Sequence, residues 1–493
     1  MKKYIIIIIL ICVSSFSVAC EDDFLDQQPT DQVSTDAATA TTDNLFLVLN
    51  GIHRALYIRF QNGQGRGGQG AMMLQMEALG EDYVMTGRAN GFFINAYQWN
   101  DHTNSFDADD LFPYRTHYRY IRNANTIING AAAAVGPDAD RNAAVGQALI
   151  YRAWSHFQIV QLYGQRYVPG GNNTQLGVPI RLTVDGEPLA RATVEEVYTQ
   201  VHADLDEAIT LLEGYQRPNK SHLDVSVAQG LKARVALVQG DYAMAAQFAP
   251  LARAENTLFT FDDYFNNFSD FSSDEWMWGS FIQADQTDVF GNYGAFISRN
   301  FSSSNIRGNP KAISSALHAT IPTTDVRSQI FDPTGEHPNL PGGAVISSRH
   351  SRHPFTNQKF IAAGTGDSRM DVPHMRASEM YLIEAEARAN MGDDAGAAAI
   401  LFELGSARDP SYTLSTNTGQ ALIDEILLQR RWELWGEGFR FYDLKRLDLP
   451  LNRNGSNHNA NLAVIFDVPA GDPRWQWQIP QSALDNNPLL VQN

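Results

Sequence analysis

The chain has 493 residues, a formal net charge of −18, 44% hydrophobic residues and 11% aromatic residues. This composition supports a large folded core and excludes a wholly disordered chain. The acidic excess argues against nucleic acid as a partner, because duplex binding depends on Lys and Arg contacts with phosphates. It argues equally against electrostatic binding to an anionic bilayer.

The first 19 residues have the pattern of a secretory signal peptide. Lys2 and Lys3 precede an unbroken apolar run from Ile5 to Val13, which is too short to span a bilayer as a helix. Ser17-Val18-Ala19-Cys20 then resembles a bacterial lipobox, in which the cysteine is acylated and becomes the first mature residue. The alternative is an ordinary signal followed by a chance cysteine. We expect Cys20 to carry the lipid anchor.

The residues after Cys20 indicate a tether. No cysteine follows Cys20, so the mature body can hold neither an internal disulfide nor a Cys-ligated zinc ion. Glu21-Asp22-Asp23 resembles a surface-export signal of Bacteroidetes lipoproteins, and a solvated acidic linker is the alternative reading. Residues 26–43 are rich in Gln, Thr, Asp and Ala. We therefore divide the chain into a signal peptide (1–19), a lipidated tether (20–43) and one folded domain (44–493).

The body has the pattern of paired helices. Apolar or small residues recur at helical spacing in four segments: Ala148–Gly164, Thr193–Leu212, Ala228–Ala249 and Met380–Leu401. Thr193 and Glu196 form a capping-box pattern. Gly-Asp turns at Gly240 and Gly392 are each followed by alanines, which resembles a tetratricopeptide repeat. These signals predict a helix-pair scaffold over about residues 120–250 and 376–446.

The stretch from about residue 255 to 370 is different. It is rich in Phe, Ser, Asn, Gly and Pro and has no sustained helical period. Glu275–Ile282, with Trp276 and Trp278 alternating, predicts a strand. Long ordered loops inside a compact protein are often functional, so we expect a ligand-binding part here and in residues 60–115.

Catalytic and cofactor motifs give no positive signal. The sequence has no H-E-x-x-H, G-x-S-x-G or G-K-[ST] motif. Gly63, Gly65 and Gly68 match a dinucleotide motif by spacing, but the preceding segment has a helical pattern, so a mobile loop is the better interpretation and no cofactor is expected. A catalytic carboxylate pair cannot be recognised among 55 acidic residues.

Two groups of residues contain side chains of metal-binding types. His350 and His353 are flanked by arginines, which disfavour a cation, so we interpret this segment as a solvated basic loop. Asp107, Asp109 and Asp110 have oxygen ligands suited to calcium. The sixth-position glycine and terminal glutamate of an EF-hand are absent, which favours a polar turn.

The aromatic residues carry the strongest hint of ligand binding. Sugar rings stack on aromatic side chains, while amides and Arg bind their hydroxyl groups. Aromatic residues are more often core, and Trp276 and Trp278 fit that interpretation best. Tyr293 and Phe296 lie in a Gly-Asn-rich stretch, where exposed rings are expected. The candidate ligand-binding residues are Arg88, Phe92, Tyr97, Trp99, Asn100, Asn292, Tyr293 and Phe296.

The ordered set of motifs resembles the SusD/RagB family of Bacteroidetes outer-membrane nutrient-uptake lipoproteins. The match begins with C-E-D-D-F-L-D-Q-Q-P at Cys20 and is strongest near the end of the chain. There, Arg430-Arg431-Trp432-Glu433-Leu434 is followed by Glu437-Gly438-x-Arg440 and Asp443-Leu444-Lys445-Arg446. Gln429 departs from the glutamate that the family usually carries. We interpret Arg430, Glu433, Glu437, Arg440 and Asp443 as a structural charge network, since spacings of three and four place them on neighbouring helical faces.

The resemblance implies a mainly α fold, with tetratricopeptide-like helix pairs packed on a loop-rich ligand-binding part that has a few short strands. It implies no catalysis. It implies an outer-membrane, lipid-anchored protein facing the cell exterior, which captures an oligosaccharide and acts as a lid over a SusC-like TonB-dependent transporter. The ligand site of starch-binding members corresponds to residues 88–100 and 292–294. Three alternatives remain: a peptide or another nutrient as ligand, a lipid-anchored tetratricopeptide scaffold that binds protein, and a surface glycosidase.

Overall fold

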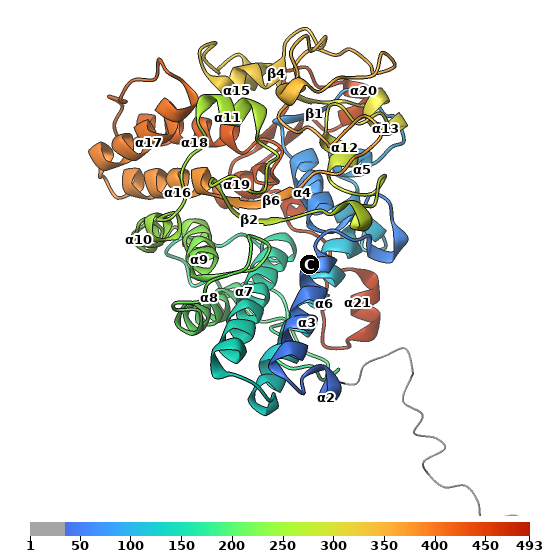
Figure 1. Cartoon of the computed structure of the whole chain (residues 1–493), viewed down its shortest axis with the longest axis vertical. Coiled ribbons are helices and arrows are strands. Elements are labelled where there is room, and N and C mark those ends of the chain that lie inside the picture. The colour runs from blue at the N-terminus through green and yellow to red at the C-terminus, as the bar shows by residue number, and fades with distance from the viewer. Residues whose placement is uncertain (1–34) are drawn as a thin grey trace, which may run out of the picture.

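The computed structural model describes residues 35–493, so Cys20 and the lipobox lie outside the described residues. Helices dominate and the strands are few and short (Figure 1), which confirms the predicted mainly α fold. In chain order the helices are α2 (Thr35–Ala38), α3 (Thr42–Ala55), α4 (Gly68–Leu79), α5 (Ile94–Tyr97), α6 (Ala108–Gly130), α7 (Asp138–Tyr163), α8 (Val194–Leu211), α9 (Val225–Gln239), α10 (Tyr242–Ala252), α11 (Phe261–Asn266), α12 (Gly294–Ile297), α13 (Ser304–Gly308), α14 (Ser315–His318), α15 (Val326–Gln329), α16 (Ala377–Asn390), α17 (Asp394–Arg408), α18 (Gln420–Glu433), α19 (Arg440–Arg446), α20 (Ala460–Ala463) and α21 (Gln481–Asn486). Within residues 35–493, no helix has both the length and the apolar character needed to cross a membrane.

The folded chain begins earlier than the sequence suggests. The sequence assigns residues 35–43 to the tether, yet α2 lies here and α3 begins at Thr42. Thr41 caps α3, because its hydroxyl oxygen accepts a hydrogen bond from the Asn44 backbone N–H (3.2 Å). The Thr42 backbone N–H donates to the carbonyl of Val135 (3.0 Å). Residues 35–43 therefore include structured chain that packs on the body.

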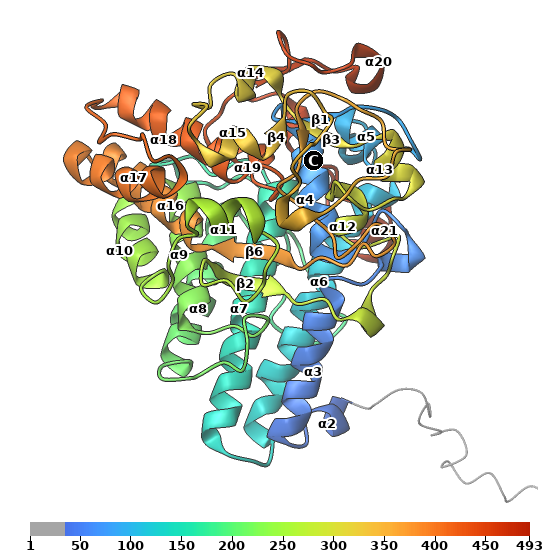
Figure 2. The same cartoon turned by 45° about the horizontal axis from the view of Figure 1, so that its top comes forward.

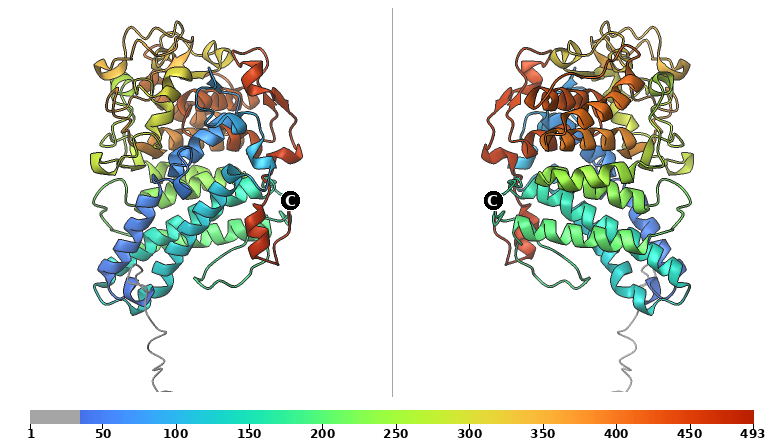
Figure 3. Two further views of the ribbon diagram at one scale, coloured as in Figure 1. Left: turned by 90° about the vertical axis from the view of Figure 1, so that its right-hand side faces the viewer. Right: turned by 90° about the vertical axis from the view of Figure 1, so that its left-hand side faces the viewer.

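The predicted helix pairs are present and stack on one another. They are α7 with α8, α9 with α10, and α16 with α17, and consecutive pairs are in contact. Figure 3 shows them as successive layers from the teal helices through the green to the orange ones. Such pairs stack because one pair alone cannot bury its apolar face. We call α6–α10 and α16–α19 the helix-pair part.

Local sequence signals set the ends of these helices. The capping box of α8 forms as predicted: the Thr193 hydroxyl accepts from the Glu196 backbone N–H, and the Glu196 carboxylate accepts from the Thr193 N–H. Gly240 ends α9 in the left-handed conformation (φ 71°), and Asp241 then caps α10. A turn with positive φ at Gly392 likewise separates α16 from α17 (φ 82°).

The loop-rich part comprises residues 80–107 and 253–372, and it lies over one side of the helix layers (Figure 2). It holds a four-stranded antiparallel sheet of order β1-β3-β5-β4, and β2 pairs with β6 in a separate antiparallel ribbon. The strands are β1 (Tyr83–Met85), β2 (Trp276–Ser280), β3 (Lys311–Ile313), β4 (Phe331–Asp332), β5 (Thr356–Asn357), β6 (Val372–Arg376), β7 (Leu451–Asn452) and β8 (Asp467–Val468). The strand predicted at residues 275–282 is thus confirmed as β2.

Strand β2 joins two hydrophobic cores. Trp276 enters the core of the loop-rich part, while Trp278 enters the core of the helices, and neither ring is exposed to solvent. The Trp278 ring meets Trp154 of α7 edge-on, with 5.1 Å between the ring centroids. In a regular strand these two side chains would share one face, but the pairing of β2 with β6 shifts register between Trp276 and Trp278, and such an irregularity lets one short strand serve both cores. Both tryptophans are structural, as their alternation predicts.

A buried network of charged side chains also joins the two parts. Glu433, at the end of α18, accepts hydrogen bonds from Arg376 at the end of β6 (2.9 Å) and from Arg408 at the end of α17 (3.1 Å). Arg327 of α15 reaches the same carboxylate at 3.5 Å. All four side chains are fully buried. The network is completed by Glu275, Asp325, Lys359 and Glu437.

The predicted composition of this network was only partly right. Arg430 and Asp443 form an ion pair (2.8 Å), but Glu433 and Glu437 bind arginines that come from distant parts of the chain. Helix α18 ends at Glu433, and positive-φ glycines turn the chain before α19 begins at Arg440. The helical spacing argument fails there because Glu437 does not lie on a helix. Arg440 instead binds Glu81 (2.5 Å).

Candidate ligand-binding site

The loop after β1 contains five of the predicted ligand-binding residues, and it buries two of them. Tyr97 is fully buried, with its hydroxyl bonded to His458 Nδ1 and the Arg453 guanidinium 4.5 Å from its ring centroid. Trp99 is 2% exposed, and its Nε1–H donates to the carbonyl of Leu79 (3.0 Å). Neither ring can stack on a ligand in this conformation. These two candidate ligand-binding residues therefore pack inside the protein.

The other three residues of that loop are accessible. Arg88 and Asn100 are exposed, and Phe92 is half-buried. The Phe92 ring meets Phe296 edge-on, at 5.1 Å between centroids. Asn90 is exposed beside Arg88, and its Nδ2–H donates to the Ser304 hydroxyl (3.0 Å). This loop offers scattered polar groups at the surface with Phe92 as its half-open ring.

The second predicted group lies inside the loop-rich part. Asn292, Tyr293 and Phe296 are 5%, 2% and 1% exposed. The Tyr293 hydroxyl donates to the carbonyl of Gly436 (2.6 Å), and the Asn292 Nδ2–H donates to the Ser368 hydroxyl (2.7 Å). These residues hold distant loops together, so the expectation that their rings are exposed was wrong.

Close backbone packing explains why glycines gather at this point. A Cβ at Gly294 would overlap the carbonyl oxygen of Ser368, and a Cβ at Gly67 would overlap that of Gly291. The glycines therefore allow two backbone segments to approach closely. They belong to a packed region here, whereas the sequence suggested an exposed loop. A sequence pattern of Gly and Asn does not distinguish the two situations.

A groove lies in the loop-rich part, lined by residues from the end of α11 and from the segment that follows β2. It consists of two adjoining hollows of about 450 Å³ and about 560 Å³. Both are lined by Ser269 and by residues 361–363. Residues 341–345 also line the first hollow, and residues 281–284 with 369–371 line the second. We call this the 269/362 groove.

Aromatic rings and amides meet at the 269/362 groove. Phe281 is 49% exposed, and its ring lies 5.5 Å from that of half-buried Phe271, tilted by 36°. Half-buried Phe265 lines the other hollow. Polar lining residues include Asn266, Asn267, Asn300 and Gln283. An open ring beside amide groups can bind a sugar through its C–H face and its hydroxyls.

The wall of this groove is held by internal hydrogen bonds. The Asn300 side chain donates to the carbonyl of Ala362 (2.7 Å) and accepts from the Ala362 N–H (2.8 Å). The Asp371 carboxylate accepts from the Ile282 N–H (2.8 Å), and burial raises the pKa of Asp371 to about 6. Lys359 is held by the Glu437 carboxylate (2.7 Å). The groove is thus built of groups whose positions are fixed before a ligand arrives.

Sequence reasoning missed Phe265, Phe271 and Phe281 as candidate ligand-binding residues. They occur in a stretch of phenylalanines separated by Asn, Asp and Ser, a composition that predicts loops. Rings interleaved with small polar residues are the available signal for exposed aromatics. Which of those rings face solvent depends on packing against residues 361–371, about 90 positions away.

The sequence argued against a metal site both at His350 and His353 and at Asp107, Asp109 and Asp110. The structure shows a different environment for each group. His350 is 4% exposed, and its Nδ1 lies 3.1 Å from the Arg299 guanidinium, so His350 is packed, while Arg349 is exposed and His353 is half-buried. Asp107 caps α6 by accepting from the Asp109 N–H (2.7 Å), as a polar turn would. Asp101 joins these aspartates in space, a residue that the sequence did not single out.

Comparison with known proteins finds two family models and several solved structures that match this chain. A family model described as starch-binding and associating with the outer membrane matches residues 23–237, and a SusD family model matches residues 335–493. No curated protein matches the chain. A SusD-like carbohydrate-binding protein of Bacteroides vulgatus has a similar structure, with 25% identity and a TM-score of 0.79, covering 92% of this chain and 98% of its own. A SusD superfamily protein of Bacteroides thetaiotaomicron has 24% identity and a TM-score of 0.77, covering 92% and 99%. A putative sugar-binding protein of Bacteroides vulgatus has 23% identity and a TM-score of 0.75, covering 92% and 98%.

Proposed function

The chain belongs to the SusD/RagB family, and on this premise we propose that it captures an oligosaccharide at the bacterial surface without catalysing a reaction. It then passes the oligosaccharide to a SusC-like TonB-dependent transporter, over which it acts as a lid. The observation that carries the glycan part of this proposal is the 269/362 groove, where the open Phe281 ring stands among amide groups.

The proposed anchor follows from the beginning of the sequence. A signal peptide of residues 1–19 is removed, and acylation of Cys20 attaches the mature protein to the outer membrane on its exterior side. Each buried methylene contributes about 0.8 kcal/mol, so several acyl chains such as palmitate form a durable anchor. Mass spectrometry of the intact protein purified from membranes tests this step, since an unmodified N-terminus at another residue would contradict it.

The glycan site is proposed at the 269/362 groove, with Phe281 as the stacking residue. Arg88, Phe92 and Asn100 remain candidates for a second contact, because they are the accessible members of the set predicted from the sequence. Tyr97, Trp99, Asn292, Tyr293 and Phe296 are proposed to support the loops and not to touch the ligand.

The experiment is isothermal titration of the protein against panels of glycans and peptides. The Phe281→Ala variant is expected to weaken glycan binding about two- to tenfold, in line with the 0.5–1.5 kcal/mol typical of aromatic stacking. Phe402→Ala is the matched control, because Phe402 is 37% exposed on α17 and does not line the groove. Equal affinity of Phe281→Ala and wild-type protein for every glycan that binds would contradict the proposed site.

A peptide ligand remains the second candidate, because the amides of Asn266, Asn267 and Gln283 can also bind a peptide backbone. The peptide panel separates the two. A protein-binding tetratricopeptide groove is less favoured. The cavity among α4, α7, α9 and α19 holds only about 60 Å³, and Trp278 of β2 covers the adjacent face of α7. A glycosidase would release product from a polysaccharide in the same assay mixture.

A further inference from the structure

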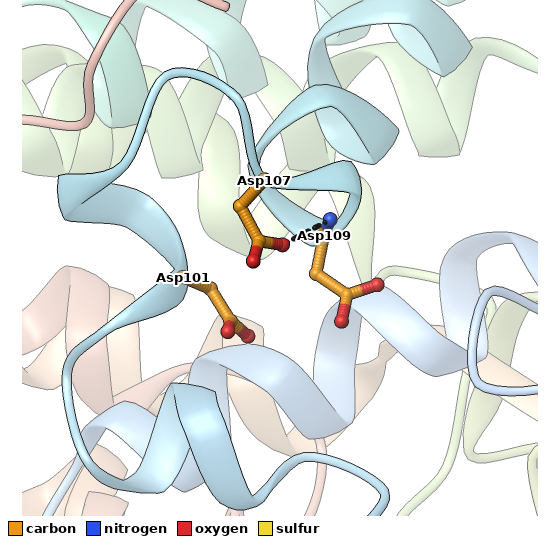
Figure 4. A group of neighbouring side chains, drawn as sticks. All are labelled: Asp101, Asp107 and Asp109. Atoms are coloured by element: carbon orange, nitrogen blue, oxygen red, sulfur yellow. Dashed lines mark hydrogen bonds between the residues drawn. The ribbon is translucent and has the colours of Figure 1, made fainter.

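Three aspartates converge at the start of α6. Asp101 begins a short 3₁₀ helix (Asp101–Thr103), Asp107 is the N-cap of α6, and Asp109 lies in its first turn. One carboxylate oxygen from each lies within 4.8 Å of the other two, and Figure 4 shows the three side chains facing a common space. Calcium binds oxygen atoms at 2.3–2.6 Å, so it can bridge ligand oxygens up to about 5 Å apart, whereas magnesium at about 2.1 Å spans only about 4.2 Å.

The side chain of Gln75 also favours calcium as the ligand of this cluster. Gln75 of α4 is 3% exposed, and its Oε1 atom has no hydrogen-bond partner. Gln75 lines one cavity of about 140 Å³ together with Asp101 and Asp109, and its Nε2–H donates to the Asp109 carbonyl (3.1 Å). A buried carbonyl oxygen without a partner is rare in a folded protein, and it is a common calcium ligand. The cavity also leaves room for waters that complete the coordination.

The charge around this cavity is unbalanced. Asp101 is 2% exposed and Asp110 is fully buried, and three of their four carboxylate oxygens have no hydrogen-bond partner. Among residues 35–493, the cation paired with the cluster is Arg66, whose Nε–H donates to Asp109 Oδ1 (2.6 Å). One guanidinium, bound to Asp109, is therefore the cation paired with a cluster of four carboxyl groups. Buried like charges are costly unless a cation offsets them.

We propose that Asp101, Asp107 and Asp109, with the Gln75 amide oxygen, bind a calcium ion. The ion joins three segments: α4, the loop that leads from β1 to α6, and the first turn of α6. Asn90, Phe92 and Asn95 line the same cavity, so the ion fixes the loop that carries the accessible residues Arg88 and Phe92. This proposal does not depend on the nature of the organic ligand, because none of its evidence involves the 269/362 groove.

The test is calcium titration of the full-length protein, purified in detergent and stripped with EDTA. Calorimetry is expected to show one calcium ion bound with a dissociation constant at or below about 1 mM, the range of extracellular modules. Calcium is also expected to raise the melting temperature, because it binds the folded state only. Magnesium at equal concentration should bind at least tenfold more weakly. No calcium binding up to about 10 mM overturns the proposal.

Variants connect the binding to these residues. Asp107→Asn and Asp101→Asn should each weaken calcium binding at least tenfold and reduce the calcium-dependent shift in melting temperature. Asn is as good an N-cap as Asp, so Asp107→Asn retains the start of α6. Asp285→Asn is the control, because Asp285 is exposed and lies outside the cluster. Wild-type affinity in both cluster variants overturns the proposed ligands. Circular dichroism identifies a variant that fails to fold. If one of the two cluster variants is unfolded, the calcium affinity of the other tests the proposed ligands.

Discussion

Replacing Glu433 with glutamine is expected to destabilise the protein, because this carboxylate binds three buried arginines. Arg376 and Arg408 donate to it at 2.9 Å and 3.1 Å, and Arg327 lies at 3.5 Å. Burial by itself raises the pKa of Glu433, but Arg408, Arg376 and Arg327 outweigh burial and hold that pKa well below its usual range. The carboxylate is therefore fully ionised at pH 7. Its contribution to stability is lost only when the pH falls below the usual carboxyl range.

The magnitude follows from the burial of the network. Removing one partner of a fully buried ion pair costs about 3–5 kcal/mol, because the remaining charge stays buried without compensation. The unfolding entropy is about 2.1 cal/mol/K per residue. For the roughly 460 described residues this gives about 1 kcal/mol/K, so Glu433→Gln should lower the melting temperature by about 3–5 °C.

The assay is differential scanning calorimetry at pH 7 with a matched control. Glu403→Gln removes the same charge from an exposed position on α17 and should leave the melting temperature unchanged. Combining Glu433→Gln with Arg408→Gln restores the balance of charge, so the double variant should lose less than the sum of the two single variants. A melting temperature of Glu433→Gln within 1 °C of wild type would refute the reasoning, as would strict additivity of the pair.

Three further predictions concern buried groups. Burial raises the pKa of Glu77 to about 8, so between about pH 5 and 8 the folded state keeps a proton that the unfolded chain has lost. As the pH rises through this window, the free energy of unfolding of the wild-type protein should therefore fall relative to that of Glu77→Gln. Urea titrations should show a difference of at most about 1.4 kcal/mol per pH unit. Gly67→Ala should cost at least about 2 kcal/mol in the same titrations, since its Cβ overlaps the Gly291 carbonyl, and a neutral result would show that this contact is wrong. Tyr293→Phe should cost about 1–2 kcal/mol by leaving the carbonyl of Gly436 unpaired, with glycan affinity unchanged; lost affinity at wild-type stability would place Tyr293 in the ligand site.

The helix pairs were predictable because their signals are local. The Thr193 capping box, the turns at Gly240 and Gly392 and the spacing of small residues all act within about ten positions of the chain. Each signal fixes a helix end or a helix face without reference to distant residues. The alternation of Trp276 and Trp278 predicted a strand for the same reason, although not that the strand serves two cores.

The accessibility of the candidate site residues was less predictable, because burial in the loop-rich part is decided by long-range contacts. Tyr293 is covered through Gly436, and Asn292 through Ser368, and no periodicity connects these pairs. Composition predicted a ligand-binding part in the loop-rich stretch, and the 269/362 groove, where we propose the glycan site, lies within that stretch. It could not identify which rings are open, because a ring such as Phe281 differs from a buried one only in its distant neighbours.

The departure at Gln429 is explained by counting the charges of the buried network. The described network contains four cations and four anions: Arg327, Lys359, Arg376 and Arg408 with Glu275, Asp325, Glu433 and Glu437. Gln429 is 3% exposed, and its Oε1 atom accepts from the Arg327 guanidinium (2.5 Å). Glutamine therefore supplies the oxygen that Arg327 needs without adding a fifth buried negative charge. A glutamate at this position would keep the hydrogen bond but disturb the balance, and a buried charge without a counterion is costly. The neutral residue thus suits a network that is already complete, and that network holds the ends of α17 and α18 against the loops that form the 269/362 groove.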